Sequence, residues 1–379
     1  MQQRITPFRA GAGSGEGWLE AADECLDTLG NLPPGANLGI VYASGPLAHA
    51  IDLIAERLKE GTGVRDWVGS GGNAICSSVG GMTSDKAVSV LVAALPSGSF
   101  RLFDGIADGE RQPAIGDRAD DKDRFAIVHG DPHQAKILAM IERLSKTTGA
   151  FLIGGLTSTS RHDITQIAGH PTEGGLSGVL MNDSVPIITG LAQGCTPIGP
   201  AREITGVDGS WITSIDGEPA FQSLELDIGP VLARSIERKG GFILAARPLG
   251  DGEPNNYLVR DLGDVDRLRG AIMVGDDFRP GDRLCFVKRD PEGAKNDLRR
   301  VAADLRSQAS GRPILGGLYH SCIGRGRHIF GADDAELNII EEELGEMPLS
   351  GLSTHGEIFQ HRLYGYSAVL TLFLGEGPS

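Results

Sequence analysis

The segment IVHGDP at residues 127–132 joins the end of an apolar strand pattern to a polar turn and a proline. Related segments are IVYASGP at residues 40–46 and FVKRDP at residues 286–291. Aspartate before proline, as in two of the three, marks a helix start, because aspartate caps free backbone N–H groups and proline suits the first turn. We therefore predict that a strand leads into a helix at all three places.

Each proline is followed by apolar residues at spacings of three and four, which is typical of one face of a helix. A glycine-rich apolar segment comes next, and its length and position suit the second strand of a βαβ crossover. The pattern therefore predicts three repeated βαβ units. They end at WVGSGG (residues 67–72), FLIGGL (residues 151–156) and ILGGL (residues 314–318).

Shorter β-type runs bounded by glycine, proline, asparagine or aspartate lie between and after these units, as hairpin strands do. The sequence thus predicts a mixed α/β fold, in which crossover helices cover sheets that also contain antiparallel strands. We expect an N-terminal segment at residues 1–35 and two domains at residues 36–222 and 223–379.

Composition excludes several classes of protein. The formal net charge is −15, which argues against nucleic-acid binding and against an anionic membrane surface. No apolar run approaches the ~20 residues of a membrane helix, so we expect a cytoplasmic protein. The five cysteines are far apart and form no CxxC pair, so neither a disulfide framework nor a structural zinc site is expected.

Four segments resemble the bacterial FIST proteins, which carry an N-terminal and a C-terminal FIST domain. These segments are AQGCTPIGP (residues 192–200), SWITSIDGEPAF (residues 210–221), GGLYHSCIGRGRHIFG (residues 316–331) and GLSTHGEIF (residues 351–359). The resemblance implies a sensory protein that binds a small molecule such as an amino acid. It also implies signalling through a partner such as a histidine kinase or another regulator.

One segment departs from the family pattern. Many FIST proteins have a cysteine-threonine-glycine-glutamate-like turn after the first crossover. This chain has VGSGGNAICSS at residues 68–78, without that cysteine or glutamate. The departure puts a ligand site in the first repeat in doubt.

The expected ligand site lies where glycines let a ligand approach the backbone closely, beyond a strand end. Arg325 and Arg327 are suited to hold a carboxylate, and Glu357 to hold an ammonium group. The neighbouring cations are expected to lower the pKa of the Cys322 thiol. The candidate ligand-binding residues are Ser321, Cys322, Arg325, Arg327, Thr354 and Glu357.

A structural reading of the same residues stays open: Cys322 would be a packed apolar side chain, and the arginines would pair with acidic neighbours.

Two other functions also stay open. The first alternative is a haem-binding nitric oxide sensor, which the family resemblance implies and for which a single histidine would be the axial ligand. The second is a cysteine-dependent hydrolase or transferase with Cys322 as nucleophile and His320 or His355 as base. No HExxH pattern occurs, and the one HxxxH spacing, from His129 to His133, spans a predicted strand end and turn and not a helix face, so no metal ligand and no resident cofactor are assigned. No catalytic residue is assigned either, and the preferred function is that of a sensor and not of an enzyme.

Overall fold

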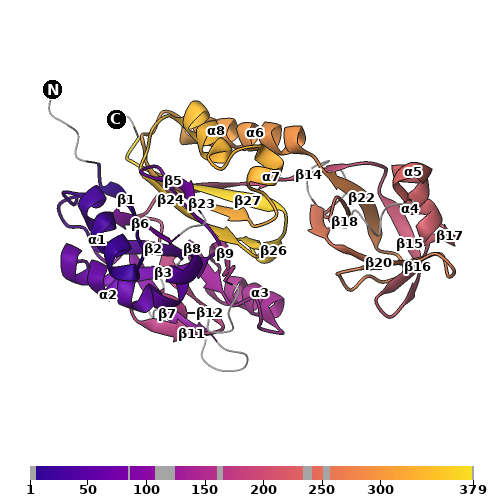
Figure 1. Cartoon of the computed structure of the whole chain (residues 1–379), viewed down its shortest axis with the longest axis horizontal. Coiled ribbons are helices and arrows are strands. Elements are labelled where there is room, and N and C mark those ends of the chain that lie inside the picture. The colour runs from indigo at the N-terminus through magenta and orange to yellow at the C-terminus, as the bar shows by residue number, and fades with distance from the viewer. Residues whose placement is uncertain are drawn as a thin grey trace. The chain divides into compact units, whose positions relative to one another are not determined.

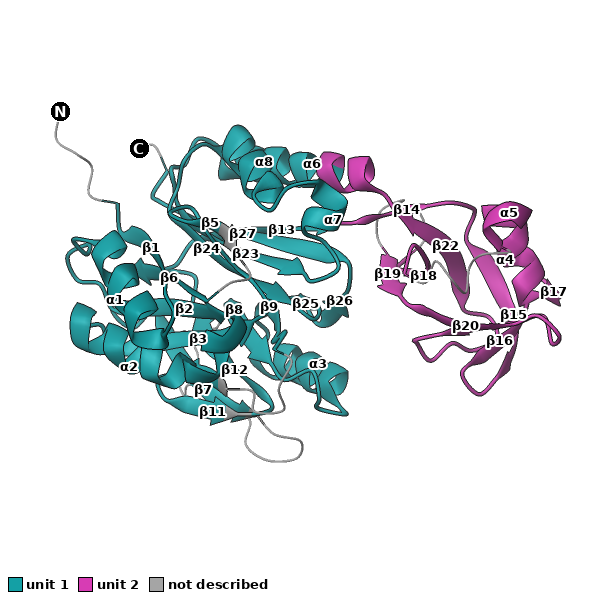
Figure 2. Ribbon diagram, viewed as in Figure 1, with its two compact units in different colours: residues 1–192, 297–379 teal, residues 193–296 magenta. Residues whose placement is uncertain are grey.

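The structure is a computed structural model that describes residues 6–83, 86–106, 124–159, 165–233, 241–250 and 257–377. The chain forms two compact units, shown in teal and magenta in Figure 2. The first unit comprises residues 1–192 and 297–379, and the second comprises residues 193–296. Strands from both halves of the chain share sheets in the first unit, so these spatial units differ from the sequence domains expected above.

Three βαβ units form the first compact unit, and in each a pair of parallel strands is connected through helical segments. The pairs are β2 (Leu38–Ser44) with β3 (Asp66–Gly72), β8 (Phe125–Gly130) with β9 (Phe151–Leu156), and β23 (Ile314–Cys322) with β24 (Leu349–Thr354). An antiparallel strand flanks the first strand of each pair. These flanking strands are β6 (Ala87–Ala93), β12 (Leu176–Met181) and β27 (Ser367–Leu374).

The predicted α/β class and the first two crossovers are confirmed, but the third crossover, at residues 286–318, is wrong. Its expected first strand, β22 (Arg283–Arg289), pairs antiparallel with β18 (Ile243–Pro248) in the second unit. Strand β23 instead begins the third βαβ unit, which continues to β24. The local strand–proline–helix pattern is present, but pairing depends on distant segments that the pattern does not contain.

The three units exchange hairpins in a ring. Each six-stranded sheet ends in a hairpin that follows the second strand of another unit. The hairpin β4–β5 (Ile75–Ser77, Gly81–Thr83) joins β24, β10–β11 (Thr165–Ala168, Pro171–Glu173) joins β3, and β25–β26 (Glu357–Phe359, Arg362–Tyr364) joins β9. The opposite edges are β1 (Phe8–Ser14), β13 (Ile187–Gln193) and β7 (Phe100–Ile106). Each of the three six-stranded sheets is therefore completed by a hairpin from another repeat.

Helices cover the outer faces of these sheets, as Figure 1 shows for α2 and α8. Amphipathic stripes in α1, α2 and α3 pack against apolar strand residues in separate clusters. Ile40, Ile127 and Leu318, from the first strands of the three repeats, share one central cluster. The helices are η1 (Gly45–Ala50), α1 (Trp18–Leu29), α2 (Ile51–Thr62), α3 (Ile137–Thr148), α6 (Pro291–Ala309), α7 (Arg327–Phe330) and α8 (Ala335–Leu344).

A glycine at the same place in each second strand permits close packing against the first strand. A Cβ atom there would lie 1.8, 2.0 or 2.0 Å from a carbonyl oxygen of the first strand, far inside contact distance. These close approaches join Gly69 to Val41, Gly154 to Val128 and Gly351 to Tyr319. Two of these glycines lie in the glycine-rich segments predicted at residues 67–72 and 151–156. The third, Gly351, lies outside the predicted segment at residues 314–318, which belongs to the first strand of its repeat, β23.

The next residue of each first strand is polar and lies at the centre of the unit. Tyr42, His129 and His320 are fully buried. Tyr42 Oη lies 2.9 Å from His320 Nε2 and 3.2 Å from His129 Nε2. Because a hydroxyl has one proton, Tyr42 donates to one imidazole and accepts from the other. Burial lowers the pKa of His129 to about 3 and that of His320 to about 4.

The described residues of the second unit form a mainly antiparallel sheet with helices beside it, around the buried residues Ile204, Ile215, Leu224 and Phe286. Its remaining strands are β14 (Cys195–Pro197), β15 (Arg202–Asp208), β16 (Trp211–Ile215), β17 (Glu218–Pro219), β19 (Tyr257–Arg260), β20 (Leu262–Asp266) and β21 (Ala271–Val274). Its helices are α4 (Ala220–Ile228) and α5 (Pro230–Ala233).

Candidate functional site

A cavity of about 310 Å³ lies in the first unit, at the carboxyl end of β23. We call it the Arg325 cavity. Four of the six candidate residues line it: Ser321, Cys322, Arg325 and Arg327. Its other lining residues are Asn73, Ala74, Ile75, Cys76, Ile323, Gly326, His328, Asp333, Glu336, Leu352 and Ser353.

Arg325 is the central charged group of this cavity. Arg325 is only 1% exposed, and its Nε lies 2.8 Å from Oε1 of the equally buried Glu336. Glu336 also accepts hydrogen bonds from Tyr319 Oη at 2.6 Å and Ser321 Oγ at 3.2 Å. Burial opposes the charge on Arg325, but Glu336 outweighs it and raises the pKa of the guanidinium above its ordinary value. Arg325 is therefore a buried cation held by a buried acid.

The two terminal nitrogens of Arg325, Nη1 and Nη2, have no hydrogen-bond partner within the described parts of the chain. Both are buried, and a buried donor without a partner costs about 1–3 kcal/mol. The guanidinium plane lies near Phe330, whose ring centre is 4.9 Å from Cζ. Arg325 thus lines the cavity as a buried cation whose two terminal nitrogens have no acceptor among the described residues.

The two other candidates, Thr354 and Glu357, do not line the Arg325 cavity. Glu357 is fully buried and accepts hydrogen bonds from Thr354 Oγ1 at 2.6 Å and from Ser367 Oγ at 2.6 Å. Burial outweighs these bonds and raises the pKa of Glu357 to about 8. Its oxygens are occupied, so the exposed Asp333 on the cavity wall is better placed to meet an ammonium group.

The expected lowering of the Cys322 pKa is wrong. Burial raises the pKa of this thiol to about 12, with a smaller contribution from Glu357 in the same direction. The backbone N–H of Gly324 donates to Sγ at 3.4 Å, and Arg325 only partly offsets the burial. Cys322 is therefore a protonated thiol at neutral pH, which removes the basis for a reactive nucleophile here.

Sequence reasoning missed one whole wall of the cavity. Residues 73–76 come from the first repeat, where they connect β3 to the exchanged hairpin and begin its strand β4, and they lie in the segment that departs from the family pattern. Glu336 was missed as well. A signal for it exists, because Glu336, Ile339 and Ile340 form the buried stripe of α8. An acid on an apolar stripe indicates a buried cationic partner.

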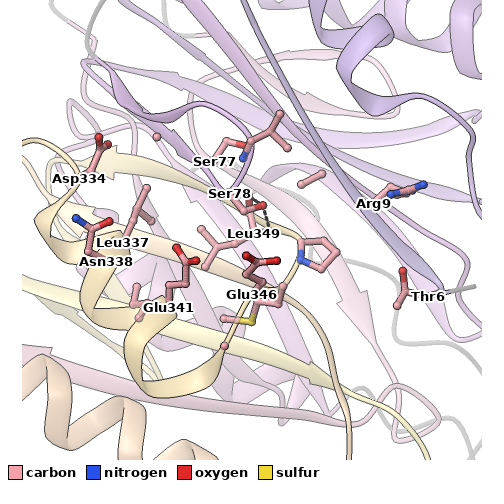
Figure 3. Close-up of a pocket in the computed structure, with 17 residues that line it drawn as sticks. Thr6, Arg9, Ser77, Ser78, Asp334, Leu337, Asn338, Glu341, Glu346 and Leu349 are labelled. Carbon is pink, nitrogen blue, oxygen red and sulfur yellow. Dashed lines mark hydrogen bonds between the residues drawn. The ribbon is translucent and has the colours of Figure 1, made fainter. Parts of the chain in front are cut away.

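A second and larger hollow, of about 660 Å³, lies beside the hairpin β4–β5 and α8. We call it the α8 groove. Figure 3 shows Leu337, Asn338 and Glu341 of α8 along one part of it and Ser77 and Ser78 of the hairpin along another. None of the candidate site residues predicted from the sequence lines this groove.

Within the described ranges, no group of three or more His, Cys, Asp or Glu residues could hold a metal ion. Over the same residues, no helix combines the length and the apolar character that crossing a membrane would need.

Comparison with known proteins identifies the family. Residues 37–218 match the FIST N domain, and residues 231–360 match the FIST C domain. An uncharacterized protein of Mycobacterium bovis is 29% identical over 378 residues, covering 94% of this chain and 95% of that protein. An uncharacterized protein of Mycobacterium tuberculosis is 29% identical over 307 residues, covering 77% of this chain and 79% of that protein. FIST domains are associated with sensory signalling by small-molecule binding. The chain belongs to the FIST family.

Proposed function

We propose that this protein is a cytoplasmic sensor that binds a small carboxylate, such as an amino acid, in the Arg325 cavity and signals through a partner protein. The observation that carries the proposal is the buried guanidinium of Arg325, whose two terminal nitrogens are unpaired among the described residues. A planar carboxylate accepts two parallel N–H bonds from one edge of a guanidinium. Binding would satisfy both nitrogens at once.

Charge balance favours a carboxylate over a phosphate. Glu336 already neutralises one positive charge beside Arg325. A dianion would leave excess negative charge in a buried place, which is costly. The exposed Arg327 adds one cation at the cavity wall, and Asp333 adds one anion that suits an ammonium group. A zwitterionic amino acid fits this pattern.

The candidate residues take two roles in this proposal. Ser321, Cys322, Arg325 and Arg327 form the cavity wall. Thr354 and Glu357 lie outside the lining and are joined by the 2.6 Å hydrogen bond that Thr354 Oγ1 donates to the Glu357 carboxyl group. The signalling partner would be a histidine kinase or another regulator that responds to the bound state.

A thermal-shift screen tests the proposal. The protein is melted with each of the twenty amino acids, with acetate and with inorganic phosphate, and haemin is included for the haem alternative. A ligand at a hundredfold excess over its Kd stabilises the folded state by about 2.7 kcal/mol. We expect a melting shift with at least one amino acid and none with phosphate.

The matched variants are Arg325→Lys, which keeps the charge but loses the two-pronged edge, and Arg299→Lys, an exposed arginine of α6. The shift should disappear in the first and persist in the second. If Arg325→Lys does not fold, Arg327→Ala replaces it and should weaken binding. An equal shift in all variants would place the ligand elsewhere.

A further inference from the structure

The Arg325 cavity and the α8 groove share two of the elements that line them, β4 and α8. On β4, Cys76 lines the cavity and its neighbour Ser77 lines the groove. On α8, Glu336 lines the cavity and its neighbour Leu337 lines the groove. Successive residues of a strand point to opposite faces, and successive residues of a helix point about a quarter-turn apart. β4 and α8 therefore contribute side chains to both hollows.

Arg325 is linked directly to α8. Glu336 lies in the first turn of this helix and holds Nε of Arg325 at 2.8 Å. A carboxylate that binds the free edge of Arg325 competes with Glu336 for the same cation. Glu336 also accepts hydrogen bonds from Tyr319 and Ser321 of β23, so this one side chain ties the first turn of α8 to the strand and to Arg325. The groove residues Leu337 and Asn338 lie on those turns.

The hairpin gives a second link between the hollows. Residues 73–76 at its root line the cavity, and Ser77, Ser78, Val79 and Gly81 line the groove. The root is bound to β24 by Ser353 N to Ala74 O at 2.9 Å, and the turn by Ser78 N to Leu349 O at 3.0 Å. A ligand that contacts the root therefore acts on a segment whose other end forms the groove wall.

We infer that occupancy of the Arg325 cavity changes the shape of the α8 groove, through Glu336 on α8 and through the root of hairpin β4–β5. The inference rests on the proposed function, because it needs a ligand at Arg325. The α8 groove is then the surface outside the cavity whose shape differs between the ligand-free and the ligand-bound protein.

A fluorescent label in the groove tests this coupling. All five native cysteines are buried, so the exposed Asn338, changed to cysteine, is the selective attachment point for an environment-sensitive dye. Leu138→Cys on α3, where the side chain is 53% exposed and lines neither hollow, is the matched control. The probes are glycine, L-alanine and sodium acetate, each titrated against both labelled proteins.

We expect the emission of labelled Asn338→Cys to shift and to saturate at the same probe concentration as the melting shift. The emission of labelled Leu138→Cys should stay constant, and adding Arg325→Lys to Asn338→Cys should abolish the shift. Hydrogen exchange of residues 73–81 in the unlabelled protein, which should slow with the probe, covers the case in which Asn338→Cys disturbs the helix.

Three results would overturn the inference. A melting shift that depends on Arg325, with unchanged emission and unchanged exchange, would remove the coupling and leave the proposed function intact. Equal emission changes at both labels would indicate a global effect. A melting shift with none of these probes and with none of the twenty amino acids would remove the coupling and the carboxylate site together.

Discussion

Nε of Arg325 lies 2.8 Å from Oε1 of Glu336, and each side chain is 1% exposed. A buried ion pair is stable only when both partners are present, because a single buried charge has lost its water without compensation. The pair joins the end of β23 to α8 and turns one edge of the guanidinium away from the carboxylate. The ion pair therefore holds α8 to the strand in the third repeat, and it leaves the terminal nitrogens of Arg325 without an acceptor among the described residues.

Replacing Glu336 with glutamine should destabilise the protein by about 3–5 kcal/mol, because the variant leaves Arg325 charged, buried and unpaired. Urea unfolding, followed by circular dichroism, measures the change. Glu342→Gln on the same helix, where the side chain is 64% exposed, should change stability by less than about 0.5 kcal/mol.

The double variant Arg325→Met/Glu336→Leu should recover most of the stability lost by Glu336→Gln, because it removes both charges and keeps apolar bulk. It should still fail to show a ligand-dependent melting shift. A single variant as stable as the parent would show that the pair contributes nothing to packing.

The sequence patterns correctly predicted those strands and helices whose determinants lie within one short segment. The strand–proline–helix order and the apolar spacing predicted the crossovers at residues 40–72 and 127–156, because those features lie inside each segment. The same pattern misassigned β22 as a crossover strand, since the partner of a strand is chosen by segments far along the chain. The exchange of hairpins between repeats has no local signal at all.

The residues that line the Arg325 cavity show the same difference between local and distant determinants. Ser321, Cys322, Arg325 and Arg327 are close in sequence, so their residue types alone suggested one site. Asn73 and Cys76 come from another repeat and reach the cavity only because hairpin β4–β5 joins the sheet of β24. The Cys322 pKa was predicted with the wrong sign because burial, which the sequence does not report, outweighs the nearby cations.

Gly154→Ala should destabilise the protein by more than about 3 kcal/mol or prevent folding. A Cβ atom would lie 2.0 Å from the carbonyl oxygen of Val128, and the glycine has a φ of +131° that side-chain-bearing residues avoid. Thermal unfolding measures the loss. Gly17→Ala is the control, since nothing lies within 4 Å of its Cβ and its φ is −131°. Equal melting temperatures for the two variants would contradict the close strand packing.

Acid should lower the stability of the folded protein through the buried histidines His129 and His320. The pKa of an ordinary histidine, 6.5, falls to about 3 at His129 and about 4 at His320, so the unfolded state binds protons first as the pH drops. Stability is complete above pH 6.5 and decreases below it by about 1.4 kcal/mol per pH unit for each histidine. His320→Gln should make this decrease less steep, whereas His361→Gln, at an exposed position, should not. Denaturant unfolding at several pH values provides the slopes.

Glu357 should make the stability of the folded protein depend on pH in the opposite direction to the two histidines. Its pKa rises from 4.5 to about 8 in the folded state, so the folded protein holds this proton more tightly than the unfolded chain does. The resulting stability is complete below pH 4.5 and is lost as the pH rises to about 8. Glu357→Gln removes this titration while an amide can still bond to Thr354 and Ser367.

The stability difference between Glu357→Gln and the parent should therefore shift in favour of the variant as the pH rises from 4.5 to 8, by about 1.4 kcal/mol per pH unit at most. Because the histidines impose the opposite slope below pH 6.5, the comparison must be made between variant and parent at each pH. A constant difference across this range would mean that Glu357 is ionised throughout. Arg325 would then have a second buried carboxylate to balance its charge, and the cavity would have less affinity for an anionic ligand.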